Sequence, residues 1–294
     1  MITRSFGLVG AGRVGLAMTR HAIMQGFDFL WGVDPRLEEL SGLDNEIVRR
    51  LHARVADIPD VPVDACVIAV GDEQIGIVTK ELVTQGTLRT GTLVFHTSGV
   101  RTSAELLPLE DAGMLTGSIH PIQSFIASAG ETPLRGIGCG IEGTDAFYAR
   151  AVALARDFGW SALRIATDQK ALYHAACVFA GNFPTVLAAL SEELLRKSAV
   201  ESPDRTLPFL LPMMEEVLSR LQHTAPRASL TGPASRGQST VLLQHFEQLL
   251  GFDSLSAEVY RSLSLAAAKL AGVSPASLSH LRAALVESEG RKDM

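Results

Sequence analysis

The 294-residue chain has few of the residues that mark a secreted or a metal-binding protein. Its three cysteines, Cys66, Cys139 and Cys177, are too few and too widely spaced for a disulfide framework or for the paired ligands of a zinc site. Each of them stands in an apolar stretch, which is typical of buried thiols that behave as small hydrophobic residues. We therefore expect no disulfides and no bound metal.

The chain also lacks an excess of positive charge. Its formal net charge is −6 and its isoelectric point is about 5.8, and lysine and arginine form no cluster. This excludes the usual electrostatic signature of binding to nucleic acid or to an anionic membrane. There is no signal-peptide pattern, and no uninterrupted apolar run reaches about 18 residues. We expect a cytoplasmic protein whose partners are small molecules or further copies of itself.

The first forty residues carry the pattern on which the functional interpretation depends. An apolar run over residues 6–9 leads into a glycine-rich turn and then into a helix-favouring stretch. The first glycine of the pattern permits a tight turn, the second lets a pyrophosphate approach the backbone, and the third lets the helix pack against the strand. The expected contacts of a dinucleotide here are Gly10, Ala11, Gly12, Arg13, Val14 and Gly15.

Two charged residues follow the next predicted strand, residues 29–33. Asp34 stands close to the offset of about twenty residues at which an acid binds the adenosine ribose, and a carboxylate there favours NAD(H) because it repels a 2′-phosphate. Arg36 could instead bind that phosphate. We slightly favour NADH as the cofactor, with NADPH as the open alternative. A strand, turn and helix with a merely solvated aspartate is the structural alternative.

Apolar runs and helical stretches alternate through the first half of the chain. The near-continuous apolar run at 65–70 is typical of a parallel strand buried on both faces, and further strands are predicted at 92–97, 117–121, 136–142 and 161–165. Helices are predicted at 36–54, 75–83, 105–112 and 144–158. The alternation predicts an α/β fold with a doubly wound, mostly parallel Rossmann sheet, whose ligands bind beyond the carboxyl ends of the strands. Val70, Gly71, Ser98 and Gly99 follow such strands and are predicted cofactor contacts.

The composition changes at Thr167, after which no run typical of a strand occurs. Long helical patterns follow at 168–197, 208–223, 239–250 and 254–270, and a short last helix is predicted to begin at Pro275. We therefore predict two domains. Residues 1–166 form a dinucleotide-binding Rossmann domain, and residues 167–294 form an all-helical domain for substrate binding and dimerisation.

Three polar residues stand on the otherwise apolar helix that follows this boundary. Lys170 and His174 are about 40° apart around a helix, and His174 and Asn182 are about 80° apart. Reduction of a carbonyl needs a donor to the developing alkoxide, which a lysine with an imidazole or amide partner supplies. The structural alternative is a solvated Lys170 and an Asn182 that caps a helix restarting near Pro184.

Two more candidates lie outside that helix. Arg236 belongs to a loop, residues 230–238, in which Gly237 frees the backbone, and a guanidinium fork suits a substrate carboxylate. His120 is predicted at a strand end beside the crevice, where it could donate a hydrogen bond to substrate. The alternatives are a solvated arginine in a surface loop and a histidine that only satisfies a backbone carbonyl.

Taken together, these stretches resemble a family of Rossmann-domain oxidoreductases with a family-specific helical C-terminal domain, some members of which are described as an alternative type of ketopantoate reductase. The layout is more distantly similar to pyrroline-carboxylate reductase, prephenate dehydrogenase and the 6-phosphogluconate-dehydrogenase-like superfamily. In the last group a helix lysine with an asparagine four residues on is catalytic, whereas this chain has His174 there. It also has Gln238 where the family usually has an acidic residue. The resemblance covers residues 5 to 250 and rests on Gly10 to Gly15, Val70-Gly-Asp72, His96-Thr-Ser-Gly99, Ser118-Ile-His-Pro121, Tyr173-His-Ala-Ala, Asn182, Leu230-Thr-Gly-Pro and Arg236-Gly.

The resemblance implies an NAD(P)H-dependent reductase of a small 2-oxo acid, with ketopantoate as the specific candidate, and a homodimer formed through the helical domain. Lys170 or His174 would supply the proton. The expected site residues are Lys170, His174, Asn182 and His120 for catalysis, and Arg236 and Ser98 for substrate binding. Reduction of an imine or oxidation of a hydroxy acid on the same scaffold stays open. A non-catalytic dinucleotide sensor is a further alternative, but such a protein would have no use for polar residues on the apolar helix that begins at Lys170.

Overall fold

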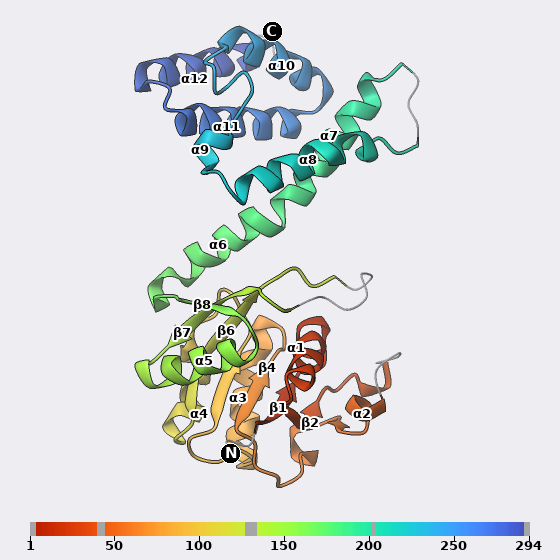
Figure 1. The fold of residues 1–294 in the computed structure, drawn as a ribbon, viewed down its shortest axis with the longest axis vertical. Coiled ribbons are helices and arrows are strands. Elements are labelled where there is room, and N and C mark those ends of the chain that lie inside the picture. Colours follow the sequence, from red (N-terminus) through yellow and green to blue (C-terminus); the bar gives the residue numbers. More distant parts are fainter. Residues whose placement is uncertain (1–3, 40–44, 127–133, 201–203, 291–294) are drawn as a thin grey trace. The chain divides into compact units, whose positions relative to one another are not determined.

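The computed structural model describes residues 4–39, 45–126, 134–200 and 204–290, and the chain divides into two compact units, Met1–Pro184 and Thr185–Met294. Over the described residues, the first unit contains an eight-stranded sheet in the order β3-β2-β1-β4-β5-β6-β7-β8 (Figure 1). Its strands are β1 Ser5–Val9, β2 Asp28–Val33, β3 Leu51–His52, β4 Ala65–Ile68, β5 Leu93–His96, β6 Leu115–Ile122, β7 Gly138–Gly143 and β8 Ser161–Arg164.

The sheet is parallel from β3 through to β6, and among the described strands the one antiparallel pair joins β6 to β7. Strand β1 lies between β2 and β4, so the chain runs outward from β1 in both directions. Such a switch point leaves a crevice beyond the carboxyl ends of the two central strands. The predicted mostly parallel, doubly wound sheet followed by a helical region is confirmed.

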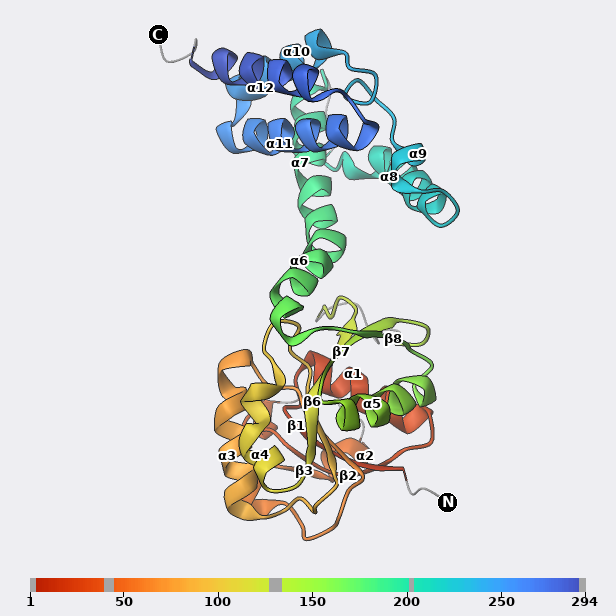
Figure 2. The same cartoon turned by 90° about the vertical axis from the view of Figure 1, so that its left-hand side faces the viewer.

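Helices cover both faces of this sheet (Figure 2). On one face, α1 and α5 bury Met18, Ala22 and Phe147 against the strands. On the other, α3 and α4 bury Ile75 and Leu109. The helical bounds in this unit are α1 Arg13–Met24, α2 Asn45–Val48, α3 Ile75–Gln85, α4 Leu107–Asp111, α5 Asp145–Asp157 and α6 Lys170–Gly181. The predicted helix starting at Thr144 is capped by that residue, whose hydroxyl accepts a hydrogen bond from Phe147 N.

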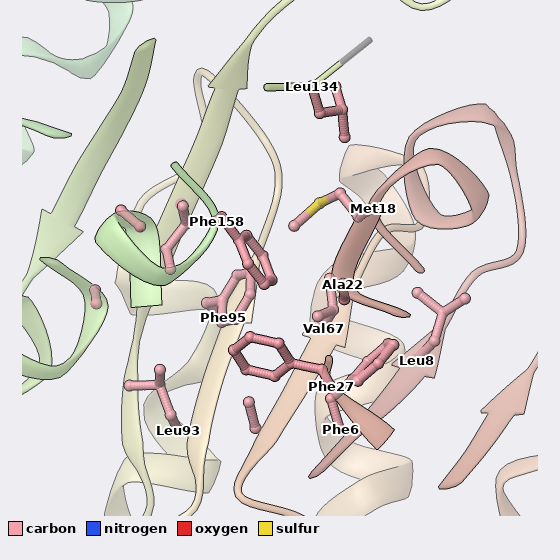
Figure 3. Packing of buried hydrophobic residues seen from close by; sticks show 14 of the residues in the cluster. Phe6, Leu8, Met18, Ala22, Phe27, Val67, Leu93, Phe95, Leu134 and Phe158 are labelled. Atoms are coloured by element: carbon pink, nitrogen blue, oxygen red, sulfur yellow. The ribbon is translucent and has the colours of Figure 1, made fainter. Parts of the chain in front are cut away.

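The core beneath α1 and α5 is rich in aromatic rings (Figure 3). Phe27 and Phe158 meet edge to face with ring centroids 5.1 Å apart, and Phe6 and Phe95 are almost completely buried. Each such side chain contributes roughly 1.5–3 kcal/mol through burial. This core and the mostly aliphatic core beneath α3 and α4 hold the strands from both faces, so the turns at the carboxyl ends of the strands are presented by a rigid scaffold.

One predicted element is wrong. The predicted helix over residues 36–54 is replaced by a 3₁₀ turn at Leu37–Glu39, the short helix α2 and the two-residue strand β3, and residues 40–44 lie outside the described residues. Strand β3 forms because Leu51 and His52 pair with Gly32 and Val33 at the sheet edge. A strand of two residues is too short to show an apolar period, so the sequence pattern does not predict it. The strand predicted at 117–121 is longer, so His120 lies within β6 rather than at its end.

The helices that continue into the second unit are α7 Phe183–Ser198, α8 Leu207–Leu221, α9 Pro226–Ser229, α10 Ser239–Phe252, α11 Ser254–Ala271 and α12 Pro275–Gly290. Leu242, Phe246 and Leu285 form the centre of a core shared by α10, α11 and α12. The helix predicted over 168–197 is divided at Asn182, where Pro184 follows and supplies no backbone donor. Residues 167–184, including α6, therefore belong to the first compact unit, while the domain limits 1–166 and 167–294 stay a prediction.

The helical stretch Thr167–Ser198 is long and apolar enough to cross a membrane by length and composition, with a mean hydropathy of 1.3 over a window of which none is buried. Leu172, Phe179 and Val186 are 69%, 66% and 50% exposed. Length and composition alone do not separate a membrane span from a helix that another protein surface covers. The finding that bears on function is an uncovered apolar surface on these helices.

Candidate active site

A cleft of about 1730 Å³ lies in the first unit, at the carboxyl ends of β1, β2 and β4. It occupies the switch point of the sheet, where open α/β sheets bind their ligands. The predicted cofactor residues that line it are Gly10, Ala11, Gly12, Arg13, Val14, Asp34, Arg36, Val70 and Gly71. The cleft is therefore built largely from the stretches in which the sequence places a dinucleotide.

The three glycines of the turn after β1 have three different roles. Gly10 has φ +96°, and a Cβ there would lie 2.6 Å from the carbonyl oxygen of Ala69. Gly15 lies beneath the turn, where a side chain would collide with the carbonyl of Gly10. A Cβ at Gly12, in contrast, would meet no protein atom nearer than Arg36 at 4.0 Å, so the space beside it belongs to the cleft.

Helix α1 begins directly after Gly12, and no side chain caps it. Its first N–H groups and the positive end of its dipole are therefore available to an anion. The open space at Gly12, the uncapped helix start and the size of the cleft fit the pyrophosphate of a dinucleotide. These residues would hold the cofactor.

Asp34 and Arg36 form a close pair at the end of β2. Arg36 donates from Nε to Oδ1 at 3.2 Å and from its terminal nitrogen to Oδ2 at 3.0 Å, and the backbone N–H groups of Ala11 and Arg36 donate to the same carboxylate at 2.9 Å. Burial tends to raise the pKa of Asp34, but these hydrogen bonds and the arginine charge hold it below its usual value. The Arg36 side chain is 58% exposed and the Asp34 side chain 1% exposed, so the guanidinium is the more accessible group at this edge of the cleft.

Lys170, the first residue of α6, is buried rather than solvated. Its ammonium donates to the hydroxyl of Ser118 at 2.6 Å and to the backbone carbonyl of Ser98 at 3.1 Å, and it lies 3.8 Å from the carboxylate of Glu142. Burial lowers the pKa of Lys170 to about 8, while the carboxylates of Glu142 and Asp72 oppose that shift. A lysine with such a pKa can lose and regain its proton near neutral pH, as proton transfer to a substrate requires.

The loop after β5 is fixed by His96. Ser98 N donates to Nδ1 of His96 at 3.2 Å, so Nε2 carries the hydrogen and donates to the carbonyl of Thr102 at 3.1 Å. Burial, together with the charge of Lys170, lowers the pKa of His96 to about 4, and the ring is neutral at pH 7. The loop that supplies the Ser98 carbonyl to the ammonium is thus held in one conformation.

Two more histidines adjoin this loop. The rings of His120 and His174 are 5.8 Å apart, and a side chain at Gly99 would collide with both, so Gly99 lies against the pair. Nδ1 of His120 is 2.7 Å from the hydroxyl of Tyr173. Burial, with the charges of His174 and Lys170, lowers the pKa of His120 to about 4.

The structure therefore brings together Lys170, His174, His120, Ser98 and Gly99 in one polar cluster. Ser98 and Gly99, predicted as cofactor contacts, lie beside this cluster rather than among the residues that line the cleft. The cluster and the cleft are neighbours, because the cleft residues Val70 and Gly71 follow β4, Ser98 follows β5, and these two strands pair side by side.

Asn182 lies apart from this cluster within the first unit, and Arg236 belongs to the second unit. Asn182 follows the last turn of α6, roughly 18 Å from Lys170 along the helix axis at 1.5 Å per residue. The two residues share one face of the helix, but this rise separates them. Arg236 belongs to the second unit, is exposed, and donates to the side-chain oxygen of Gln238 at 3.0 and 3.2 Å, so its assignment to the substrate stays a prediction.

The sequence interpretation missed several members of the cluster. Glu142, Ser118 and Tyr173 all contact the predicted catalytic residues, and His96 shapes the loop beside them. Glu142 carried a signal that could have been used, because a carboxylate in a glycine-rich and apolar strand must either reach solvent or be paired.

Two family models match adjoining parts of the chain. Residues 2–121 match a Rossmann-like domain, and residues 137–267 match a domain of unknown function, DUF2520. No curated protein matches the chain. The class defined by fold and site is thus a Rossmann-like domain combined with the mostly helical region that this second model describes.

Three solved structures resemble almost the whole chain at low identity. A candidate NADP oxidoreductase from Bacteroides fragilis has a TM-score of 0.69 and 20% identity, over 90% of this chain and 98% of that one. A protein from Thermotoga maritima has a TM-score of 0.68 and 21% identity, over 91% of this chain and 98% of that one. The third structure is prephenate dehydrogenase from Aquifex aeolicus in complex with hydroxyphenyl propionate and NAD⁺. It has a TM-score of 0.52 and 15% identity, over 99% of this chain and 94% of that one. At these identities the likeness shows the fold.

Proposed function

We propose that the protein is an NAD(P)H-dependent oxidoreductase that reduces a small 2-oxo acid, with ketopantoate as the first candidate. The observation that carries the proposal is the buried ammonium of Lys170, held by Ser98 and Ser118 beside a cleft that fits a dinucleotide. A bound reduced nicotinamide would supply the hydride. The names of two proteins with this fold, an NADP oxidoreductase and a dehydrogenase holding NAD⁺, support the same class of reaction.

Lys170 is the proton donor in this proposal. Its described hydrogen bonds use two of the three N–H groups of the ammonium, which leaves one for a substrate oxygen. The low polarity around it favours transfer of the proton once negative charge develops on that oxygen. Of the two groups that the sequence left open, Lys170 or His174, the lysine is the one that the fold buries and binds on several sides.

His120 contributes as a neutral hydrogen-bond donor. Its low pKa keeps it uncharged at pH 7, and in this proposal Nδ1 accepts from the Tyr173 hydroxyl while Nε2 carries the hydrogen. A neutral imidazole that polarises a carbonyl oxygen is an established use of such a residue. His174 lies against the same glycine and would help to enclose the reacting carbonyl.

We propose NADPH rather than NADH as the preferred cofactor, contrary to the slight preference drawn from the sequence. Both oxygens of Asp34 already accept protein hydrogen bonds, so a ribose hydroxyl would have to displace one of them. A 2′-phosphate would instead approach the exposed guanidinium of Arg36, which suits its charge and geometry.

The proposal is tested by following oxidation of NADPH and of NADH with a panel of 2-oxo acids, ketopantoate among them, and of cyclic imines. We expect turnover with at least one 2-oxo acid. Turnover only with imines would move the assignment to an imine reductase on the same scaffold. If no carbonyl or imine compound is reduced while the dinucleotide still binds, the protein is a binding module and the enzymatic proposal is wrong.

We also propose that the chain forms a homodimer through its helical region. Large apolar side chains of α8 are uncovered, with Phe209, Met213 and Leu218 between 63% and 70% exposed. Apolar surface of this extent in a water-exposed protein is typical of an interface. Sedimentation in buffer should give twice the mass of the chain. A monomer that binds lipid vesicles would instead assign this surface to a membrane.

A further inference from the structure

Glu142 lies in β7 and is almost completely buried, with 1% of its surface exposed. Ser103 donates to both of its carboxylate oxygens, from N and from the hydroxyl, each at 2.8 Å. The hydroxyl of Thr167 donates to Oε1 at 3.0 Å. Two separate segments of the chain thus fix this one carboxylate through three hydrogen bonds.

The Lys170 ammonium lies on the other side of this carboxylate. The hydroxyl of Ser118 accepts from Lys170 at 2.6 Å and donates to Oε2 of Glu142 at 3.3 Å, so it joins the two charged groups. The two charges are also 3.8 Å apart directly. Ser118 and Glu142 face each other because they are register partners in the antiparallel pair of β6 and β7.

A buried ion pair is rarely retained for stability. Removing two charges from water costs about as much as their attraction returns, and an apolar pair of similar volume often replaces them without loss. Among the described residues, the buried acids and bases other than histidine are Asp34, which lines the cleft, and this pair. Retaining the pair beside the cleft points to a use in the chemistry.

We propose that Glu142 is the positioning residue of this site: its carboxylate, directly and through Ser118, holds the Lys170 ammonium charged and aimed toward the substrate oxygen. Glu142 itself does not touch substrate. The inference rests on the proposed function only in that Lys170 is taken as the proton donor.

The charged and titratable groups that face Lys170 come from several elements. Glu142 and Asp72 are the acids, and His96 and His120 are neutral at pH 7. Without the charge of Glu142, burial would act on Lys170 with only Asp72 in opposition. The pKa of Lys170 should therefore fall below its value of about 8 in the Glu142→Gln variant.

The experiment compares Glu142→Gln, Glu142→Asp and a matched control, Asp64→Asn, in the full chain. Asp64 likewise accepts from both N and the hydroxyl of one serine, Ser5, but it stands at the amino ends of β1 and β4. The first measurement is the pKa of Lys170 by NMR of isotopically labelled lysine, assigned with Lys170→Met. The second is turnover as a function of pH.

In Glu142→Gln we expect the Lys170 pKa and the basic limb of the turnover profile to move down together by at least about one pH unit, with dinucleotide affinity unchanged. Glu142→Asp, which keeps the charge, should leave the Lys170 pKa close to its wild-type value. Asp64→Asn should change neither the Lys170 pKa nor the turnover profile. A folded Glu142→Gln protein with an unaltered Lys170 pKa would overturn the inference.

The NMR measurement separates this inference from the proposed function, because it needs no substrate. A wild type that reduces nothing contradicts the proposed function, whereas the Lys170 pKa still tests the ion pair. Should Glu142→Gln fail to fold, Ser118→Ala takes its place, since it removes only the bridging hydroxyl. We expect it to lower kcat about tenfold with little change in KM for the dinucleotide, and an unchanged kcat would overturn the inference.

Discussion

A hydrogen bond of 2.7 Å joins the hydroxyl of Tyr173 to Nδ1 of His120, and a phenol that donates to Nδ1 leaves the ring hydrogen on Nε2. Burial raises the pKa of the tyrosine and lowers that of the histidine to about 4, so the phenol keeps its hydrogen and the ring is neutral. Nε2 of His120 is left as the N–H donor on the side of Gly99.

Tyr173→Phe should therefore lower kcat by about ten- to a hundredfold, because the tautomer with hydrogen on Nδ1 becomes accessible and Nε2 ceases to be a reliable donor. Steady-state kinetics on the best substrate measure the effect. The matched control is Tyr260→Phe, which removes an equal bond of 2.7 Å to Nδ1 of His245 in the second unit. Equal effects of the two variants on kcat would contradict a role for Tyr173 in the site.

Gly12→Val should abolish binding of the dinucleotide. A branched side chain would fill the space that opens toward the cleft at the start of α1, where the phosphates are expected. Gly12→Ala should lose less affinity, since its single methyl group occupies less of that space. Isothermal titration calorimetry of the folded variants measures their affinity for the dinucleotide. Unchanged affinity in Gly12→Val would show that the cofactor does not bind in this cleft.

Arg36→Ala should weaken binding of NADPH by about 1.5–3 kcal/mol and that of NADH much less, because only the former brings a phosphate to the guanidinium. Dissociation constants for both cofactors measure this difference. Arg89→Ala serves as the control, since the Arg89 side chain is exposed to the same extent as that of Arg36, 57% against 58%, and pairs with Asp60 away from the cleft. Equal losses for NADPH and NADH would exclude a phosphate contact.

Arg236→Lys should raise KM for the 2-oxo acid, with Arg236→Ala more severe, if this arginine binds the carboxylate. The lysine keeps the charge but loses the two parallel hydrogen bonds of a guanidinium, a loss of roughly ten- to a hundredfold in kcat/KM. Affinity for the dinucleotide should stay the same. An Arg236→Lys enzyme with wild-type kinetics would favour a substrate without a carboxylate.

Local patterns were sufficient to predict every strand except β3, most helices and the cofactor turn, because glycine spacing and apolar periodicity are properties of neighbouring residues. Local patterns could not predict the proposed role of Glu142. It depends on the register that sets Ser118 opposite Glu142 and on the packing of α6 that brings Lys170 to both, neither of which a local pattern contains. Asn182 shows the limit of helical periodicity, since two residues on one helical face that are twelve positions apart are separated by about 18 Å along the axis.

The most direct test of the central claim is the turnover of the reduced dinucleotide by Lys170→Ala and by the wild type across pH, with the best 2-oxo acid from the panel. Lys170 must be protonated to donate, and its pKa is lowered to about 8, so wild-type kcat should fall as the pH rises through that value. Lys170→Ala should lose at least about a hundredfold in kcat, together with this basic limb, and still bind the dinucleotide normally. A Lys170→Ala enzyme that keeps near-normal turnover and the same pH dependence would show that another group donates the proton.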